Sequence, residues 1–172
     1  AVAYARELEK KHPDISLRFS MTTNGTLLDA EKIKFFYDNT FHIAVSIDGN
    51  QQAHDLTRPF PNGRSSYELT ARNIQKALKE IPSLETISVI DPTNVDCLPD
   101  SFNSLLDLGV RNINFNMNYE GEWDDAALER LETALEALGD CYIREYRQGR
   151  DLALNVFDAK IISHLKSGFD CG

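Results

Sequence analysis

The segment His42-Ile-Ala-Val-Ser-Ile-Asp48 alternates apolar and small polar residues with a period of two. Three further segments do the same, and helical patterns separate all four along the chain: residues 15–22, 85–90 and 112–118. Strands joined through helices run parallel, and a parallel sheet usually buries both of its faces beneath helices. Here one face is apolar and the other polar, so we expect helices on one face and a polar hollow on the other.

The alternation assigns each strand residue to one of these two faces, because successive side chains of a strand point in opposite directions. The apolar face, covered by helices, is predicted to carry Leu17, Phe19, Met21, Ile43, Val45, Ile47, Ile87, Val89, Ile113, Phe115 and Met117. The polar face is predicted to carry Ser16, Ser20, Thr22, Ala44, Ser46, Asp48, Thr86, Ser88, Asn112, Asn114, Asn116 and Asn118.

This polar face decides between two architectures. A doubly wound sheet has helices on both sides and needs two apolar faces, and an eight-stranded barrel fills its interior with branched apolar side chains. The polar set fits neither. We therefore predict an α/β fold in which about four parallel strands form a partial (β/α) barrel. Residues 1–150 would form this barrel part, and residues 151–172 a helical linker.

The open edge of the predicted sheet lies at residues 15–22. An unpaired strand edge invites association. We therefore expect the helix predicted over residues 1–11, or another chain through self-association, to cover it.

The composition excludes several classes of function. The 172 residues carry a net charge of -9, which argues against non-specific binding to nucleic acid or to an anionic membrane. The chain lacks both a membrane-length apolar run and any GxGxxG, P-loop, HExxH or GxSxG motif. The three cysteines, Cys97, Cys141 and Cys171, form no CxxC pair, so no disulfide framework or local metal site is predicted. A reducing cytoplasm is the simplest location.

The end of the second predicted strand brings Ser46, Asp48, His54, Asp55 and Arg58 close together in sequence. Ligands of parallel α/β folds bind at the C-terminal ends of strands. An Arg can hold a carboxylate through two parallel hydrogen bonds, and Ser and Asp bind hydroxyl groups such as those of a ribose. A second interpretation stays open, in which His54, Asp55 and Arg58 only fix the loop.

The other strand ends are also polar. Asn24 lies in Thr22-Thr-Asn-Gly-Thr26, although Asn-Gly is by itself a turn signal. Asp91-Pro-Thr-Asn94 ends the third strand, and Asn116, Met117 and Asn118 end the fourth. Asn side chains both donate and accept, so they suit an amide or a purine edge, or else they satisfy one another or water.

Four pieces of sequence follow one another in order: Thr22-Thr-Asn-Gly-Thr-Leu-Leu28, Val45-Ser-Ile-Asp-Gly49, His54-Asp-Leu-Thr-Arg58, and Asn73-Ile74 ahead of Leu78. Together they resemble the radical S-adenosylmethionine (SAM) enzymes with a SPASM extension, which include anaerobic sulfatase-maturating enzymes and related peptide maturases. The resemblance covers residues 1–118 well. Asp170-Cys-Gly172 resembles the start of the cysteine-rich extension.

The resemblance implies a partial (β/α)6 barrel, of which this chain supplies the third to sixth strands. Such enzymes bind SAM beside a 4Fe–4S cluster and cleave it to a 5′-deoxyadenosyl radical, which abstracts a hydrogen atom from a peptide or protein side chain. Ser46 is implied as a SAM ligand, and so is Arg58, with Arg64 and Arg72 as alternatives. Asn24 and Asp48 are implied as rim residues of this cofactor site.

The cysteines depart from the family pattern. The CxxxCxxC loop that holds the catalytic cluster in the family is absent from these residues, as is the Gly-Gly-Glu-Pro strand. Three scattered cysteines cannot gather a cluster, although Cys171 matches the position of an auxiliary-cluster ligand in the parent enzyme. We therefore expect a fragment of a radical SAM enzyme that is inactive and binds no cofactor by itself.

Two rival interpretations belong to other classes. One is a non-enzymatic scaffold or polar-ligand-binding domain with the form of a truncated barrel. The other is a flavodoxin-like α/β domain with an anion or nucleotide site.

Overall fold

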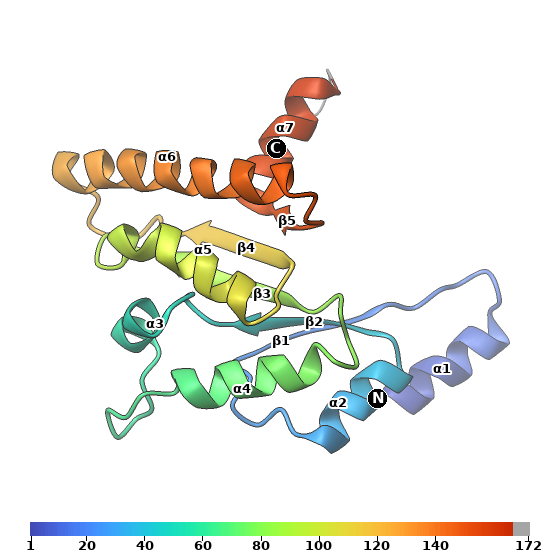
Figure 1. Ribbon diagram of the computed structural model, residues 1–172. Helices are drawn as coiled ribbons and strands as arrows, with labels where there is room; N and C mark the ends of the chain where they lie inside the picture. Colours follow the sequence, from blue (N-terminus) through green and yellow to red (C-terminus); the bar gives the residue numbers. More distant parts are fainter. Residues whose placement is uncertain (167–172) are drawn as a thin grey trace.

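A computed structural model describes residues 1–166 of the chain (Figure 1). Five strands are present: β1 (Phe19–Thr23), β2 (Phe41–Ser46), β3 (Glu85–Ile90), β4 (Asn112–Met117) and β5 (Ala153–Leu154). The helices are α1 (Val2–Lys11), α2 (Ala30–Asp38), α3 (Gln51–Thr57), α4 (Tyr67–Ala77), α5 (Leu98–Asp107), α6 (Asp125–Arg147) and α7 (Asn155–Leu165), with a short 3-10 helix, η1 (Val95–Cys97), before α5.

The strands form one parallel sheet in the order β1-β2-β3-β4-β5, which is also their order in the sequence. A doubly wound sheet reverses its strand order at a switch point, and this sheet does not. The flavodoxin-like alternative is therefore wrong. The α/β fold with a partial barrel of parallel strands is confirmed.

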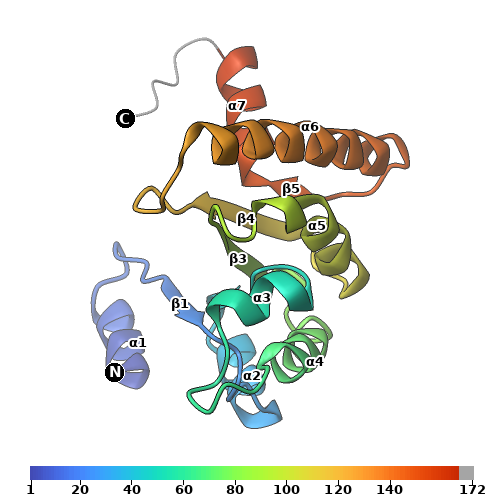
Figure 2. The same cartoon turned by 90° about the vertical axis from the view of Figure 1, so that its left-hand side faces the viewer.

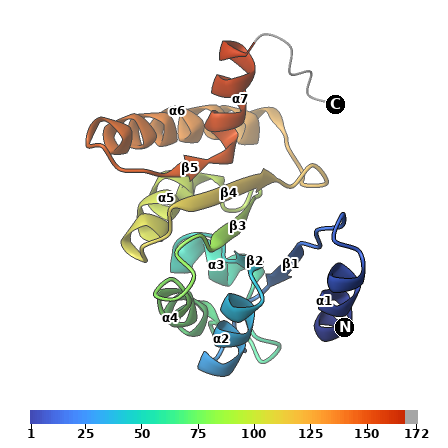
Figure 3. The ribbon, with the colours of Figure 1, turned by 90° about the vertical axis from the view of Figure 1, so that its right-hand side faces the viewer.

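Helices α2, α4 and α5 lie on one side of the sheet (Figures 2 and 3). A hydrophobic core fills the space between the sheet and its helices. The strands contribute Ile43 and Val45 from β2 and Ile113 and Phe115 from β4, and all four side chains are buried. Helices α2, α4, α5 and α6 supply the other side of this core with Ile33, Phe36, Ala71, Ile74, Ala77, Phe102, Leu105, Leu106, Ala134 and Leu138.

The opposite face of the sheet is polar along three strands, as predicted. Residues paired in a parallel register share a face, so Ser20 lies beside His42, and Thr22 beside Ala44. Ser20, Thr22, His42 and Asn116 are all exposed, which shows that no second layer of described helices buries this face.

The third strand is turned over relative to the prediction. Thr86 pairs with Val45 and Ile113, and Ser88 pairs with Phe115, so both hydroxyls lie on the helix face and are buried. Ile87 pairs with Ser46 and Asn114 on the polar face, and Val89 pairs with Asn116 beside it. The prediction for these four residues is wrong.

The reason lies at the two ends of β3. Leu84 and Ile90 have the same parity as Thr86 and Ser88, and both are almost fully buried in the core. Since side chains alternate strictly along a strand, anchoring these two large residues places every even-numbered residue between them on the helix face.

The fifth strand has no signal in the sequence. Its two residues pair with Asn112 and Ile113 of β4, so the sheet continues into a segment that we predicted to be helical. Asn155 extends this pairing with its side chain, which accepts a hydrogen bond from Phe115 N and donates one to Phe115 O. Helix α7 then starts at Asn155.

Helix α1 is tied to the beginning of the sheet by two side chains. Glu9 accepts a hydrogen bond of 2.6 Å from Leu17 N, and the Arg6 guanidinium lies 4.6 Å from the ring centre of Phe19. Strand β1 pairs with β2 alone among the described residues. Self-association through its other edge stays a prediction.

The cysteines and the lengths of the helices can be compared with what the composition predicts. Cys97 and Cys141 are buried free thiols, and burial raises the pKa of Cys97. None of the helices in the described part of the chain is long and apolar enough to cross a membrane.

Candidate functional site at the ends of the first two strands

A cleft of about 260 Å³ opens where β1 and β2 end. Asn24 and Thr26 line it from the loop after β1, and Ser46 from the last position of β2. His54 and Arg58 line it from α3 and its C-cap, and the remaining wall consists of Pro59, Phe60, Pro61 and Ser66. The cleft therefore gathers residues from four separate stretches of the sequence.

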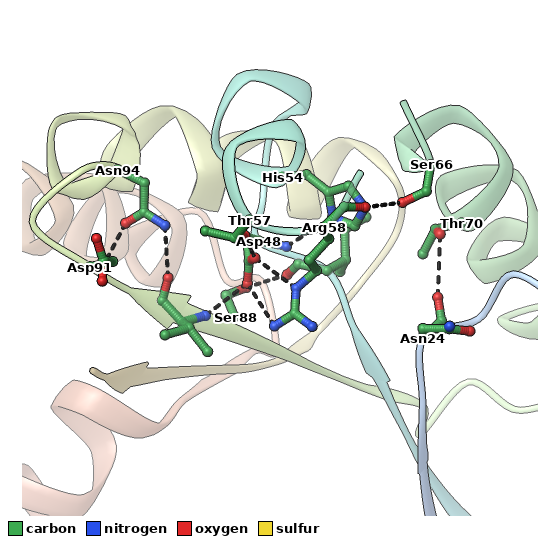
Figure 4. A network of polar contacts seen from close by, with 12 residues as sticks. Asn24, Asp48, His54, Thr57, Arg58, Ser66, Thr70, Ser88, Asp91 and Asn94 are labelled. Carbon is green, nitrogen blue, oxygen red and sulfur yellow. Dashed lines mark hydrogen bonds and ion pairs between the residues drawn. The ribbon is translucent and has the colours of Figure 1, made fainter. Parts of the chain in front are cut away.

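Arg58 is held at this cleft by Asp48 (Figure 4). The Asp48 carboxylate accepts hydrogen bonds from Arg58 Nε at 2.6 Å and from Nη2 at 3.1 Å. Thr57 Oγ1 donates a further hydrogen bond to the same carboxylate. The Asp48 side chain is almost completely buried, whereas that of Arg58 is 27% exposed. The buried acid thus fixes the plane of a guanidinium that still reaches solvent.

Asp48 also joins the ends of β2 and β3. Ile47 N donates to Ile87 O at 3.0 Å, and one position later Val89 N donates to Asp48 Oδ1 at 2.9 Å. Ser88 Oγ donates to Ile47 O at 2.6 Å. Side-chain atoms therefore continue the pairing of β2 with β3 beyond its last main-chain bond. The bond to Ile47 O satisfies the buried hydroxyl of Ser88.

His54 lies behind Arg58 and is buried. Its Nδ1 accepts a hydrogen bond from Asp48 N at 3.3 Å, and its Nε2 lies 2.8 Å from Ser66 Oγ. Burial lowers the pKa of His54, as does the nearby Arg58, while the charges of Asp48 and Asp55 act in the opposite direction. The net pKa lies below that of an ordinary histidine.

Helix α4 fixes the loop that carries Asn24. Asn73 Nδ2 donates to Gly25 O at 2.9 Å, and Thr70 Oγ1 donates to Asn24 O at 3.3 Å. The Asn24 side-chain oxygen accepts hydrogen bonds from N and Oγ1 of Thr26, which is the geometry of an Asx turn. The Asn73 side chain therefore holds the loop that contains the first of the four sequence pieces, which explains why an Asn at position 73 accompanies that loop.

The structure brings three of the four predicted cofactor-binding residues to one cleft, namely Asn24, Ser46 and Arg58. Asp48 does not line the cleft, because its carboxylate is already engaged by Arg58, Thr57 and Val89. The exposed residues Arg64 and Arg72, our alternatives to Arg58, do not line the cleft either.

The polar ends of the third and fourth strands bind each other. Asn118 Nδ2 donates to Asp91 Oδ2 at 2.8 Å, and Thr93 donates to Asp91 Oδ1. Partial burial acts to raise the pKa of Asp91, but these hydrogen bonds outweigh it and hold that pKa below its usual range. Asn94 donates to Val89 O. These polar side chains thus satisfy one another, which is the alternative that the sequence left open for the ends of the third and fourth strands.

The sequence interpretation missed two apolar residues on the polar face of the sheet. Ile87 is the register partner of Ser46, and Val89 follows it on the same face. The signal that could have placed them is the parity of Leu84 and Ile90, the two large apolar residues at the ends of β3.

Within residues 1–166, no group of three His, Cys, Asp or Glu side chains is arranged to hold a metal ion. Cys97 and Cys141 are the cysteines of this range, and both are buried. Cys171, predicted as an auxiliary-cluster ligand of a parent enzyme, lies outside the described residues.

Comparison with known proteins places this geometry in context. No protein-family model matches the chain. It is 24% identical over 152 residues to the cysteine-type anaerobic sulfatase-maturating enzyme of Clostridium novyi, covering 84% of this chain and 41% of that protein. It is 30% identical over 112 residues to the serine-type enzyme of Bacteroides thetaiotaomicron, covering 64% of this chain and 27% of that protein.

Solved structures show the same fold. Native anSMEcpe with bound AdoMet and the Cp18Cys peptide superposes with a TM-score of 0.80 at 18% identity, covering 99% of this chain and 49% of that one. The chain thus spans less than half the length of these relatives. Its homologues are anaerobic sulfatase-maturating enzymes of the radical SAM family, which confirms the resemblance predicted from the motifs.

Proposed function

We propose that the cleft between β1, β2 and the segment after α3 binds SAM. The observation behind this proposal is the Asp48–Arg58 pair, which holds a partly exposed guanidinium at a cleft also lined by Ser46. Among the described residues, Nη1 of Arg58 and the hydroxyl of Ser46 make no hydrogen bond, so both are available to a ligand. Arg58 would bind the carboxylate of the methionine moiety.

The rest of the ligand has matching chemistry close by. The Ser46 hydroxyl and the Asn24 amide would bind ribose hydroxyls or an adenine edge. Ile87 and Val89, on the polar face beside Ser46, offer an apolar surface for the adenine ring. When bound, SAM supplies the 5′-deoxyadenosyl group for radical chemistry.

The described residues do not fit a 4Fe–4S cluster. Cys97 and Cys141 are buried at separate places, and a cluster needs several thiolates in one place. No reaction step can therefore be assigned to these residues. We propose that the chain by itself is inactive, and that its cysteine-free cleft acts in a longer enzyme that supplies the cluster and carries a SPASM extension.

We propose a peptide or protein side chain as the substrate of that enzyme. The related proteins are sulfatase-maturating enzymes, and two of the similar solved structures contain a bound peptide. A cytoplasmic location without a nucleic-acid or membrane partner belongs to the same proposal, and the net charge of -9 supports it.

Titration of the chain with SAM, followed by NMR chemical shifts, tests this function. Although the sequence led us to expect no cofactor on the chain alone, the preformed cleft supports weak binding, which NMR detects. We expect the shifts to centre on Ser46 and Arg58, and Ser46→Ala or Arg58→Lys to weaken binding about tenfold.

Arg130→Lys is the matched control, because Arg130 is an exposed arginine paired with Asp96 on another surface. This variant should bind like the wild type. Binding that is equal in all variants, or shifts that centre elsewhere, would contradict the proposed site. Binding of unrelated polar ligands with no preference for SAM would favour the non-enzymatic alternative.

A further inference from the structure

We propose that neutral His54 is a positioning residue that closes the wall of the cleft through Ser66. The wall is the segment of residues 59–65, which we call the wall segment. The proposal rests on the proposed function only for the identity of the ligand. The contacts within the chain stand independently of it.

One hydroxyl joins the two ends of the wall segment. Ser66 Oγ, at the C-terminal end, donates a hydrogen bond of 2.7 Å to Arg58 O at the N-terminal end. Pro59, Phe60 and Pro61, which lie between these ends, line the cleft. The bond between Ser66 and Arg58 therefore ties the two ends of this wall together, beside a bond of 2.8 Å from Ser65 Oγ to Asp55 Oδ1.

His54 fixes the Ser66 hydroxyl in the orientation that this bond needs. Asp48 N can only donate, so Nδ1 of His54 must be the acceptor and Nε2 must carry the proton. Nε2–H then donates to Ser66 Oγ, whose own proton is left for Arg58 O. All three bonds run in one direction, and the first of them, from Asp48 N to Nδ1, requires the neutral ring.

A protonated ring cannot complete this series. It would carry a hydrogen on Nδ1, facing the amide hydrogen of Asp48. The titratable and charged groups around the ring are Asp48, Asp55, Arg58 and Tyr67, whose ring centre lies 5.7 Å away in an edge-to-face contact. The two carboxylates favour the charged ring, but burial and Arg58 favour the neutral one, and the pKa of His54 is lowered in total.

His54 and Asp48 thus fix Arg58 from two sides. The carboxylate of Asp48 orients the guanidinium, while the imidazole of His54 orients the carbonyl of the same residue through Ser66. Protonation would put two N–H groups face to face at Nδ1 and Asp48 N, so acidification should displace the ring, loosen its hold on Ser66 and the wall segment, and lower the affinity of the cleft.

The first experiment needs no ligand. Long-range nitrogen–proton NMR at about pH 7.5 should show His54 as the neutral tautomer with its proton on Nε2. The amide protons of Phe60 and Gly63, which are bonded within the wall segment, should lose protection, measured against the intrinsic exchange rate at each pH, once the ring is protonated or Ser66 is replaced by Ala. An Nδ1–H tautomer, or exchange unaffected by both changes, would overturn the proposal.

The second experiment measures SAM affinity against pH in a variant series. Wild-type affinity should fall about tenfold between about pH 7.5 and about pH 5. His54→Gln retains an amide that reaches Ser66, so its affinity should stay within about threefold of wild type and lose the pH dependence. His54→Asn cannot reach Ser66, and it should bind about tenfold more weakly at both pH values, as should Ser66→Ala.

His12→Gln is the control, because His12 is an exposed histidine of the same chain. It should keep the wild-type profile. A pH dependence that survives in His54→Gln would overturn the proposal. If the wild type fails to bind SAM at any pH, the proposed function fails, and the tautomer and amide exchange then decide separately on the role of His54.

Discussion

Asp48 and Arg58 form a two-bond ion pair across helix α3, with Nε–Oδ2 and Nη2–Oδ1 distances of 2.6 and 3.1 Å. The acid is buried and the base is partly exposed, so the pair is anchored on its Asp48 side. Asp48 also accepts from Val89 N on the neighbouring strand. The position of Arg58 is therefore set by the sheet itself, although Arg58 lies outside every strand.

Replacing Asp48 by Asn should reduce both stability and ligand binding. The amide is isosteric, but it leaves the guanidinium without its buried counter-charge, and we expect a loss of about 2 kcal/mol in the free energy of unfolding because Arg58 is partly solvated. SAM binding should weaken in parallel. Chemical denaturation and the NMR titration measure the two effects.

Asp96→Asn is the comparison for this variant, since it removes an equally short but exposed pair with Arg130. Exposed ion pairs contribute little, so the loss should stay below about 1 kcal/mol. Equal losses in the two variants would contradict the role given to Asp48.

Replacing Thr86 by Val should stabilise the protein. The Thr86 hydroxyl is buried on the helix face of β3, and among the described residues it has no hydrogen-bond partner. Valine has nearly the same shape without the unsatisfied group, so we expect a gain of about 1 kcal/mol in the free energy of unfolding. If Thr86 faced the open side of the sheet, this substitution would leave thermal or chemical denaturation unchanged.

Replacing Gly49 by Ala should be strongly destabilising. Gly49 has a φ of +85°, and an added Cβ would lie 2.0 Å from the Cβ of Ser101. Strain and overlap together should cost about 3 kcal/mol. Gly63→Ala isolates the first of these causes, because Gly63 has a φ of +77° with nothing within 4 Å of its added Cβ. Its loss should be about 1 kcal/mol, and a loss as large as that of Gly49→Ala would refute the steric explanation.

The stability of the protein should depend on pH through His54. Its pKa is lower in the folded chain than in the unfolded one, so between the two values the unfolded state binds more protons and stability rises with pH. The contribution is complete above the unfolded pKa of about 6.5 and is lost as the pH falls through the folded value. Denaturation midpoints over this range should show a slope that His54→Gln reduces.

Iron and sulfide reconstitution should leave the chain without a stable four-iron cluster. Cys97 and Cys141 are buried, and thiolates are not gathered at one place in the described part of the chain. Absorption and iron content after desalting measure the outcome. A stoichiometric cluster band that survives desalting would show that a cluster forms without the CxxxCxxC loop, and it would contradict this prediction.

The order of the elements and the two-faced character of the sheet were predictable from local patterns. Period-two alternation in β1, β2 and β4 gave the correct faces, and the order of the motifs gave the correct relatives. Asn24, Ser46 and Arg58 line one cleft in the structure, and their role in binding a cofactor stays a prediction.

Other features depend on contacts between residues far apart in the sequence. In and around β3, the even-numbered and the odd-numbered residues each include two large apolar side chains, so either set could have faced the helices. Only the burial of Leu84 and Ile90 against the helices decided between the two sets. The two-residue strand β5 exists only because β4 and Asn155 pair with it. Local propensity contains no information about such partners.

The sequence by itself determined the parallel α/β fold, the family resemblance and the set of residues at the strand ends, since these follow from periodicity and order. The tertiary structure alone decided what each of those residues does. Ser46, His54 and Arg58 line the cleft, whereas Asp48 is buried outside it, and the two buried residues, Asp48 and His54, hold Arg58 in place. The physical reason is that a side chain's role depends on its partners and its burial, which the folded chain fixes across long sequence separations.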